Sequence, residues 1–343
     1  MNNKKWTWQL PFLLFLIAAS VIIIRHKGNP VSNTPYQQSE GHIFGTIWHA
    51  TYQSDSALDA AIMDELCRVD NSLSMFNPHS TLSQINQGRS TQTDDLLRQV
   101  LTQAMEVSRA TDGSFDVTVA PLVNAWGFGF KDGALPDSAQ VDSLLDIVGW
   151  QKVSLAGDSI LKSDSRMVLD LSAIAKGFGV DQVASLFRRK GIQNFMIEIG
   201  GEIVVQGHNA KGKNWNIGVN KPVEDSTSMN QEIQTILSLT DCAMATSGNY
   251  RNYYISSDGR KLAHTIDPHT GYPVQHSILS STVLAPSCAM ADAFATAFMV
   301  MGLERAQKLL NEQSQLQAYF IYADSENQLQ IWCSEALRQY IKK

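Results

Sequence analysis

Two oxygen-bearing residues in the C-terminal third of the chain are spaced for metal-dependent chemistry. Asp292 and Thr296 lie four positions apart in an alanine-rich stretch typical of a helix, so their side chains share one helix face. A carboxylate and a hydroxyl on one face suit a hard divalent cation, which prefers oxygen ligands. The neighbouring residues are small, which would serve packing and would also let a loop carbonyl or a ligand phosphate approach the same ion: Ala289, Ala291, Ala293, Ala295 and Ala297. A buried aspartate satisfied by a helix-borne threonine is the alternative.

The segment HTIDPHTGYP, residues 264–273, precedes that helix. Its Asp-Pro, Thr-Gly and Tyr-Pro pairs are typical of loops, which explains the composition but not the histidines. His264 follows a predicted strand, whose end would hold it in place. A near-neutral imidazole there could accept a proton from an attacking hydroxyl. Turn chemistry and general-base chemistry are both open readings of this segment.

A third segment, VLDLSAIAKGFGVD at residues 168–181, combines a predicted strand, an aspartate, a polar turn and a helix start. Helix N-termini attract anions, and Lys176 in the first turn would add a charge suited to a phosphate. The other reading is an ordinary strand-to-helix junction, with Asp170 or Ser172 as a cap and Lys176 in solvent. Gly177 and Gly179 lack a third glycine, so a dinucleotide-binding fingerprint is not supported.

The elements that would position these segments alternate between helices and hairpins. We expect a strand over 43–52, then helices over 54–69 and from Thr93 to about Asp112, and a third over 137–148. A short strand over 167–171 leads into a helix ending near Gly191, and strands 195–199 and 202–206 flank a Gly-Gly turn. Another hairpin turns at 257–259. This is an α+β pattern with mixed or antiparallel sheets and flanking helices.

The N-terminus predicts a membrane segment. Lys4 and Lys5 precede an apolar run over 10–24, and Trp6 and Trp8 would lie at the interface. We expect a signal anchor over 1–27 without a cleavage site, a flexible linker over 28–40 and one large catalytic domain over 41–343. The lysines before the apolar run place that domain on the extracytoplasmic, periplasmic side of the cytoplasmic (inner) membrane.

Composition narrows the class of protein. The 343 residues are 44% hydrophobic and 17% charged, which predicts a globular body with a sizeable core. A net charge of -6 and a single compact basic cluster, Arg188 to Lys190, argue against a nucleic-acid partner. The four cysteines, at 67, 242, 288 and 333, form no CxxC pair, so we expect core residues, with one disulfide an open alternative.

The ordered motifs resemble the FAD:protein FMN transferases of the ApbE family. The resemblance runs from Gly41 to the C-terminus and rests on eight stretches: FGT from Phe44, LSMFNPHSTLSQIN from Leu73, SFDVTVAPLVNAWGFG from Ser114, DLSAIAKGFGVD from Asp170, IEIGGEI from Ile197, TSGNY from Thr246, HTIDPHTGYP from His264 and ADAFATAFMVMG from Ala291.

The resemblance implies that FAD is the substrate and that a divalent cation, Mg²⁺ or Mn²⁺ in its place, assists its cleavage. FMN is then esterified to a threonine or serine of an acceptor flavoprotein, and AMP leaves. The cation would be held by the carbonyl of Ala173 and the side chains of Asp292 and Thr296, with His264 as the base. The implied FAD contacts are Phe44, where many relatives have methionine, Phe76, Ser114, Phe115, Asp116, Asp170, Lys176 and Ile266.

Two alternatives to transfer remain at this point. Water in place of the acceptor would make the chain an FAD pyrophosphatase that yields FMN and AMP. A flavin-binding or storage protein would bind FAD without turnover, but it would need neither a base nor a cation site.

Overall fold

The computed structural model describes residues 34–129, 135–222, 232–248, 253–255, 261–275, 277–326 and 328–342. The chain divides into two units, Met1–Pro35 and Tyr36–Lys343. The membrane segment expected over 1–27 lies outside the described residues. Among the residues that are described, no helix is both long and apolar enough to cross a bilayer.

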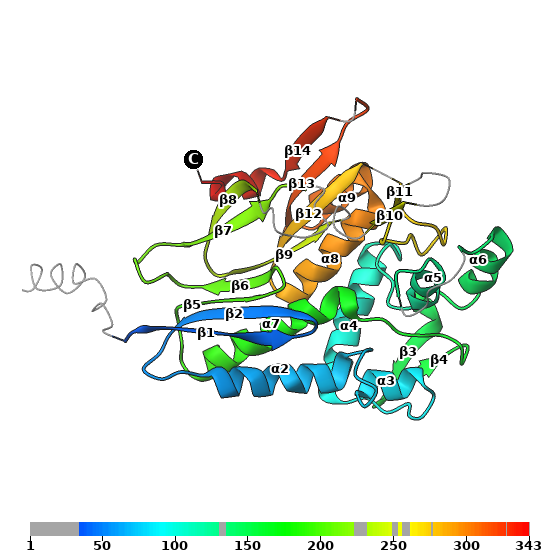
Figure 1. Ribbon diagram of the computed structural model, residues 1–343, viewed down its shortest axis with the longest axis horizontal. Coiled ribbons are helices and arrows are strands. Elements are labelled where there is room, and N and C mark those ends of the chain that lie inside the picture. Colours follow the sequence, from blue (N-terminus) through cyan, green and yellow to red (C-terminus); the bar gives the residue numbers. More distant parts are fainter. Residues whose placement is uncertain are drawn as a thin grey trace, which may run out of the picture. The chain divides into compact units, whose positions relative to one another are not determined.

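An eight-stranded sheet forms the centre of the unit Tyr36–Lys343 (Figure 1). All of its neighbouring strands pair antiparallel. In spatial order the strands are β1 (Tyr36–Ile43), β2 (Thr46–Gln53), β5 (Phe195–Ile199), β6 (Glu202–Gln206), β9 (Cys242–Gly248), β12 (Ile278–Ala285), β13 (Gln317–Ala323) and β14 (Leu329–Cys333). The antiparallel, α+β architecture expected from the sequence is confirmed.

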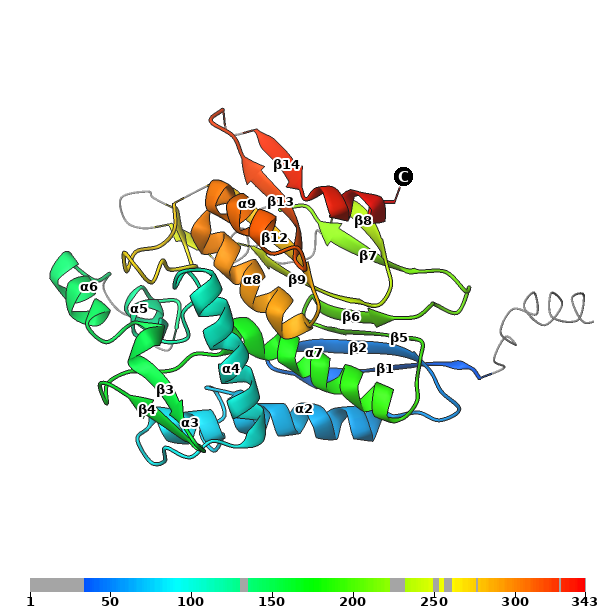
Figure 2. The same ribbon diagram turned by 180° about the vertical axis from the view of Figure 1, so that it is seen from behind.

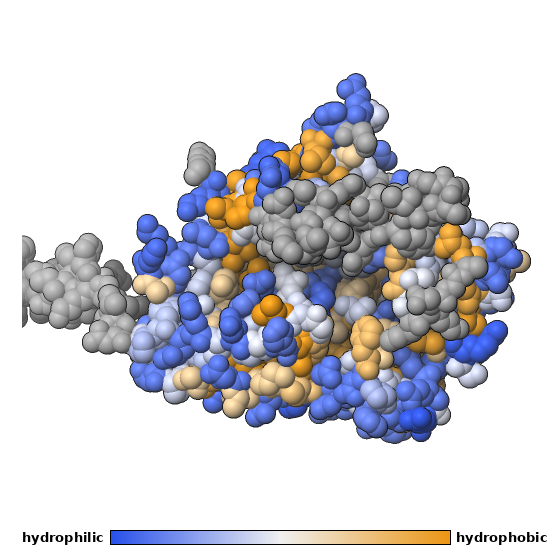
Figure 3. Space-filling view, viewed as in Figure 1, coloured by the Kyte–Doolittle hydropathy of each residue, from blue (hydrophilic) through white to orange (hydrophobic). Residues whose placement is uncertain are grey.

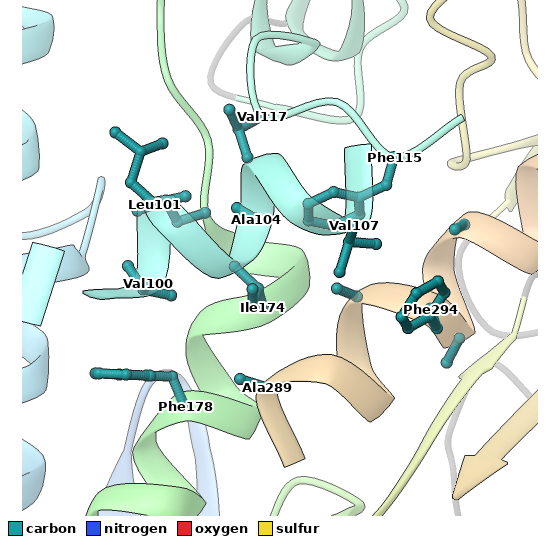
Figure 4. Close-up of a cluster of buried hydrophobic side chains, with 14 of the residues drawn as sticks. Val100, Leu101, Ala104, Val107, Phe115, Val117, Ile174, Phe178, Ala289 and Phe294 are labelled. Carbon is teal, nitrogen blue, oxygen red and sulfur yellow. The ribbon is translucent and has the colours of Figure 1, made fainter. Parts of the chain in front are cut away.

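Helices pack on one face of this sheet, in front of it as seen in Figure 2. They are α2 (Asp59–Leu73), α4 (Asp95–Ala110), α7 (Ser172–Arg189), α8 (Cys288–Met301) and α9 (Leu303–Glu312). The apolar faces of α4, α7 and α8 meet in one core, where Leu101, Ile174 and Ala289 are fully buried (Figure 4). Close packing there fixes α7 and α8, the two helices that carry the predicted cation ligands.

The other face of the sheet is covered by a two-stranded sheet, β7 (Trp215–Asn220) with β8 (Ile233–Leu239), and by a short 3-10 helix, η2 (Glu335–Tyr340). Trp215 and Leu239 pack there against Met244 of the large sheet. Figure 3 shows hydrophobic surface near β7, β8 and β14, where exposed apolar side chains include Ile233, Leu329 and Ile331.

Shorter elements complete the unit at the end of the helix layer. They are α3 (Thr81–Asn86), α5 (Ala120–Ala125), α6 (Ser138–Leu145), the 3-10 helix η1 (Trp150–Lys152) and the hairpins β3 (Val153–Ala156) with β4 (Ser159–Lys162) and β10 (Tyr253–Ile255) with β11 (Lys261–Ala263). The turn expected at 257–259 lies outside the described residues, but the strands on either side of it do pair.

The first strand expectation needs correction. Residues 43–52 were expected as one strand, whereas the chain makes a hairpin of β1 and β2. Phe44 and Gly45 form its two-residue turn, with φ angles of 52° and 71°, and Ile43 pairs with Thr46. Positive φ at both positions is typical of a type I′ turn. Because β1 begins at Tyr36, the catalytic unit starts inside the segment 28–40 that was expected as linker.

The short strand expected over 167–171 is also wrong. Those residues form no strand. Instead, the Asn86 side chain accepts a hydrogen bond from the Leu169 N–H and donates one to the Leu169 carbonyl, and the Asp170 N–H donates to the Val117 carbonyl. A side-chain amide therefore replaces a strand partner, and the segment leads directly into α7.

The remaining expectations hold in outline. The hairpin over 195–206 has the expected bounds, and Asp94 caps α4 through the Leu97 N–H. The helix expected over 54–69 begins later, at Asp59, and the one expected over 137–148 is shorter, because α6 ends at Leu145. All four cysteines are free thiols, and only Cys288 is fully buried.

Candidate active site

A cleft of about 450 Å³ opens where α7, α8 and the loop after β11 meet. Residues from distant parts of the sequence line it, including the Gly200–Glu202 turn and the end of β9. Ten of the twelve predicted site residues are brought together here: Ser114, Phe115, Asp116, Asp170, Ala173, Lys176, His264, Ile266, Asp292 and Thr296. The separate sequence motifs thus form one site.

The other two predicted residues, Phe44 and Phe76, line a neighbouring hollow of about 110 Å³. That hollow shares Ser172 and Lys176 with the cleft, so the two lie next to each other at the start of α7. Phe76 is 72% exposed. The positive φ of Phe44 is a strained conformation for a bulky residue, and such strain often occurs at ligand sites.

Asp292 is held against the first turns of α7. It is 3% exposed, and its Oδ2 accepts a hydrogen bond of 3.1 Å from the Gly177 N–H. In an α-helix that N–H points toward the carbonyl of the residue four positions earlier, here Ala173. The Asp292 carboxylate and the Ala173 carbonyl therefore lie at the same turn, next to the cleft.

A glycine makes this close approach possible. A Cβ on Gly177 would lie 2.3 Å from the Cys288 carbonyl oxygen of α8, so only glycine fits between the two helices. The alanines of α8 have a packing role as well: all five are fully buried in the core, whereas Asp292, Thr296 and Val300 line the cleft. The expectation that these alanines serve packing is therefore confirmed, and none of them lines the cleft, so the part of the expectation that concerned access is not supported.

Thr296 has a hydroxyl partner that sequence reasoning did not single out. Its Oγ1 lies 3.1 Å from Oγ of Ser247, which comes from the end of β9 and also lines the cleft. Thr296 is partly buried, and this contact orients its hydroxyl. Ser247 lies in the TSGNY stretch, but no local pattern indicates a partner 49 residues away.

Lys176 has an ion-pair partner, so the part of the junction reading that left it in solvent is wrong. It is the fifth residue of α7 rather than part of the first turn, and its Nζ lies 2.5 Å from Oε1 of Glu202. Glu202 is 2% exposed, lines the cleft and was missed as a site residue because no sequence signal pairs it with Lys176. Burial alone would lower the pKa of Lys176, but Asp292 and Glu202 raise it above its usual range.

The two carboxyl groups beside Lys176 have perturbed acidity. Burial raises the pKa of Glu202, although the charge of Lys176 opposes this shift. Burial also raises the pKa of Asp292, against the charge of Lys176 and the hydrogen bond from Gly177. Clusters of perturbed ionisable groups in a cleft are typical of functional sites.

Asp170 lies just before the N-terminus of α7, where its Oδ1 accepts a hydrogen bond of 2.8 Å from the Ser172 N–H. This local turn holds the carboxylate at the cleft, which Ser172 and Ala173 at the start of α7 also line. An anion there would meet the positive end of the helix dipole.

Ser114 and Asp116 lie in a wall of the cleft that several hydrogen bonds hold in place. Arg305 donates to Ser114 Oγ, and the Asp116 carboxylate accepts hydrogen bonds from the N–H and Oγ1 of Thr118 and from the Trp150 N–H. Burial raises the pKa of Asp116, while these hydrogen bonds act in the opposite direction. Asp116 thus has a structural role in addition to lining the cleft.

His264 and Ile266 come from the loop after β11. His264 is partly buried, and its ring lies edge-on to Phe128 with centroids 6.4 Å apart. Within the loop Ile266 bridges to Pro273, and Gly271 donates to the Asp267 carbonyl. Trp126 Nε1 donates to the Gly271 carbonyl, which fastens the loop to the end of α5. The turn reading of the segment is confirmed, and its turns present His264 to the cleft, where a role as general base stays a prediction.

Comparisons with known proteins agree with this arrangement. A sequence model described as the ApbE family matches residues 44–320. A protein of Vibrio cholerae named FAD:protein FMN transferase is 36% identical over 88% of this chain and 92% of its own length. One of Haemophilus influenzae with the same name is 36% identical over 82% of this chain and 85% of its own length.

Solved structures show the same fold. The flavin transferase ApbE from Vibrio cholerae superposes with a TM-score of 0.78 at 33% identity, over 89% of this chain and 100% of that one. The flavinyl transferase ApbE from Pseudomonas stutzeri, in its apo form, gives 0.79 at 27% identity, over 89% and 96%. The resemblance that the sequence motifs indicated is confirmed: this chain belongs to the ApbE family.

Proposed function

We propose that this chain is an FAD:protein FMN transferase, the activity for which its relatives are named. The observation that carries the proposal is the convergence of ten predicted residues on one cleft, where a buried carboxylate, a lysine and a histidine lie together. In this reaction a hydroxyl oxygen of the acceptor forms a bond to the FMN phosphorus of FAD. The phosphorus–oxygen bond to AMP breaks, and FMN becomes esterified to the acceptor.

The donor set at the α7–α8 contact fits a divalent cation. The Ala173 carbonyl, the Asp292 carboxylate and the Thr296 hydroxyl are all oxygen donors, which Mg²⁺ and Mn²⁺ accept. Within the described part of the chain, no three His, Cys, Asp or Glu side chains cluster as a metal site, so a cage of protein side chains is not formed. One carboxylate is nonetheless typical of Mg²⁺ sites that substrate phosphates complete. A cation bound there would neutralise charge that develops on the departing phosphate.

Other groups of the protein would bind the substrate and accept the proton in this reaction. Lys176 and the N-terminus of α7 attract the pyrophosphate, because both are positive. His264 accepts the proton of the attacking hydroxyl. The hydrogen bond between Trp126 and the Gly271 carbonyl holds the His264 loop to the end of α5 and so helps to fix the position of the imidazole. Phe44 and Phe76 offer apolar surface for the flavin or adenine ring, since the hollow they line lies next to the cleft and shares Ser172 and Lys176 with it.

The relatives' names favour transfer over hydrolysis of FAD and over storage of flavin. The acceptor is a flavoprotein that presents a threonine or serine. We propose in addition that the segment before Tyr36 anchors the enzyme in the cytoplasmic membrane with the catalytic unit on the periplasmic side, on the basis of the apolar run and its flanking lysines.

The experiment that tests the function measures AMP release from FAD by the purified full-length chain, with Mg²⁺ and with or without a threonine-bearing acceptor protein. We expect AMP together with flavin fluorescence that stays on the denatured acceptor. Release of AMP and free FMN regardless of acceptor would replace the proposal with a pyrophosphatase. Tight FAD binding with neither product would favour storage.

A further inference from the structure

The ion pair between Lys176 and Glu202 contributes little to stability. Glu202 begins β6 directly after Gly200 and Gly201, whose φ angles of 61° and 103° turn the chain sharply. The turn directs Glu202 inward, where its side chain is 3% exposed and lines the cleft, whereas the Lys176 side chain is 32% exposed. Because removing the Glu202 charge from water costs about as much as its attraction to the ammonium returns, the pair is weak support for the fold.

The pair is also incompletely satisfied. Lys176 Nζ bonds Oε1 of Glu202, whereas Oε2 is buried and has no hydrogen-bond partner among the described residues. A carboxylate that served only to hold the fold together would be expected to use both oxygens. Glu202 thus depends mainly on one partner, the Lys176 ammonium.

Two carboxylates compete for that ammonium. The charges of Asp292 and Glu202 both raise the pKa of Lys176, and both residues line the same cleft. Yet Lys176 makes its ion pair with Glu202, and in the part of the chain that the structure describes it makes none with Asp292. Among the described residues, the hydrogen bond that Asp292 accepts comes from the Gly177 N–H. Its carboxylate thereby stays available for the cation that the proposed function requires.

We infer that Glu202 is a positioning residue, which holds the Lys176 ammonium away from Asp292 so that the Asp292 carboxylate can ligate the cation. Lysine has a flexible four-carbon stem, and opposite charges attract strongly in a poorly solvated site. Without the charge of Glu202, Lys176 would turn to Asp292 and compete with the metal ion. The inference rests on the cation site of the proposed function and adds to it a residue whose partner is Lys176 rather than the metal.

A Mn²⁺ titration of the full-length chain, without FAD, tests this role apart from catalysis. Binding is followed by the loss of the free-ion EPR signal. We expect Glu202→Gln, which keeps the size of the side chain, to weaken Mn²⁺ binding about tenfold, as is common when a group that supports a metal ligand is changed. The double variant Lys176→Met/Glu202→Gln should regain wild-type affinity or better, because the competing ammonium is gone.

The matched control is Glu198→Gln, on the preceding strand of the same hairpin. Glu198 is partly exposed, pairs across the sheet with His49 and is not among the residues that line the cleft. The Mn²⁺ affinity of the Glu198→Gln variant should therefore equal that of the wild type. If Glu202→Gln does not fold, the Mn²⁺ affinity of the double variant, which lacks both charges, is compared with that of Lys176→Met alone. Because the ammonium is absent from both variants, they should bind Mn²⁺ with equal affinity.

A kinetic readout separates positioning from a general loss of structure. The Mg²⁺ concentration for half-maximal activity should rise about tenfold in Glu202→Gln, while the rate at saturating Mg²⁺ stays near that of the wild type. Equal Mn²⁺ affinity in the wild type and Glu202→Gln, or no recovery in the double variant, overturns the role of Glu202 alone. A wild-type chain that binds no Mn²⁺ overturns the cation site and the inference together.

Discussion

The Asp292 carboxylate on α8 accepts a hydrogen bond from the backbone of Gly177 on α7, at a point where the two helices nearly touch. This single contact joins the two sequence motifs from which the cation site was predicted. It also explains why a glycine occurs inside a helix, where it costs about 1 kcal/mol relative to alanine. Contact between the helices, rather than loop flexibility, is what this glycine provides.

Gly177→Ala should therefore damage both stability and activity. The added Cβ would meet the Cys288 carbonyl oxygen at 2.3 Å, so α7 and α8 must separate, at a cost of about 1–3 kcal/mol in the free energy of unfolding. Because Asp292 would shift away from Ala173, AMP release should fall further than the loss of folded protein explains. Thermal melting and AMP assays on the soluble fraction measure the two effects. Wild-type activity in a folded variant would contradict the proposed geometry.

Asp292→Ala tests the predicted cation ligand directly. At limiting Mg²⁺ we expect AMP release to fall at least about 100-fold, since the site has one carboxylate and Mg²⁺ sites usually rest on one or two. Asp142→Ala, an exposed aspartate of α6, is the matched control and should behave as the wild type. Unchanged turnover of Asp292→Ala at limiting Mg²⁺ would remove Asp292 from the cation site.

Ser247→Ala tests the partner of Thr296. Because the Ser247 hydroxyl orients Thr296 Oγ1, its loss should raise the Mg²⁺ concentration for half-maximal activity about 10-fold and leave the maximal rate largely intact. Ser238→Ala, a half-buried serine of β8, serves as the control. A lower maximal rate with unchanged Mg²⁺ dependence would indicate that Ser247 contacts the substrate instead.

Sequence patterns predicted the parts of this molecule that depend on local chemistry. The hairpin over 195–206 follows from alternating apolar residues around Gly-Gly, and the shared face of Asp292 and Thr296 follows from helix periodicity. Features that depend on distant partners were not predicted. Nothing near Leu169 indicates that the Asn86 side chain will replace a strand, and nothing near Lys176 indicates Glu202.

The Phe44 turn was missed for a different reason. A bulky residue with positive φ contradicts local preference, so the sequence around Phe44 favours a continuous strand over a type I′ turn. The structure accounts for it, because the Phe44 ring lies against Gly179 of α7, where a Cβ would approach its Cε2 within 2.8 Å. Packing against α7 thus holds the strained turn, and the glycine at 179 serves that contact rather than a nucleotide.

Phe44→Asn should separate strain from ligand contact. Asparagine tolerates the left-handed conformation, so the turn itself should be relieved of about 1 kcal/mol of strain, which offsets part of the lost packing. The hollow beside Lys176 would lose its aromatic wall, and we expect FAD to bind about 10-fold more weakly. Melting temperature and flavin fluorescence titration give the two quantities. Unchanged FAD affinity would exclude Phe44 as a contact.

Asp181 should make stability depend on pH. Its two carboxylate oxygens accept the N–H groups of Cys288 and Ala289 at the start of α8, but burial outweighs these bonds and raises its pKa to about 6. The unfolded chain has the ordinary value of about 3.9. A carboxyl group whose pKa is raised by folding binds its proton more tightly in the folded state. Asp181 therefore destabilises the fold progressively as pH rises from about 4 to 6, and by a constant amount above that.

Asp181→Asn, which cannot ionise, isolates this effect. The free energy of unfolding of the wild type minus that of the variant should decrease between pH 4 and pH 6 and level off near pH 7, in urea titrations at matched ionic strength. The absolute difference also contains the hydrogen bond that asparagine cannot accept, so the slope with pH is the decisive quantity. A difference that does not change with pH, or one that increases, would show that Asp181 is not held in a destabilising buried position.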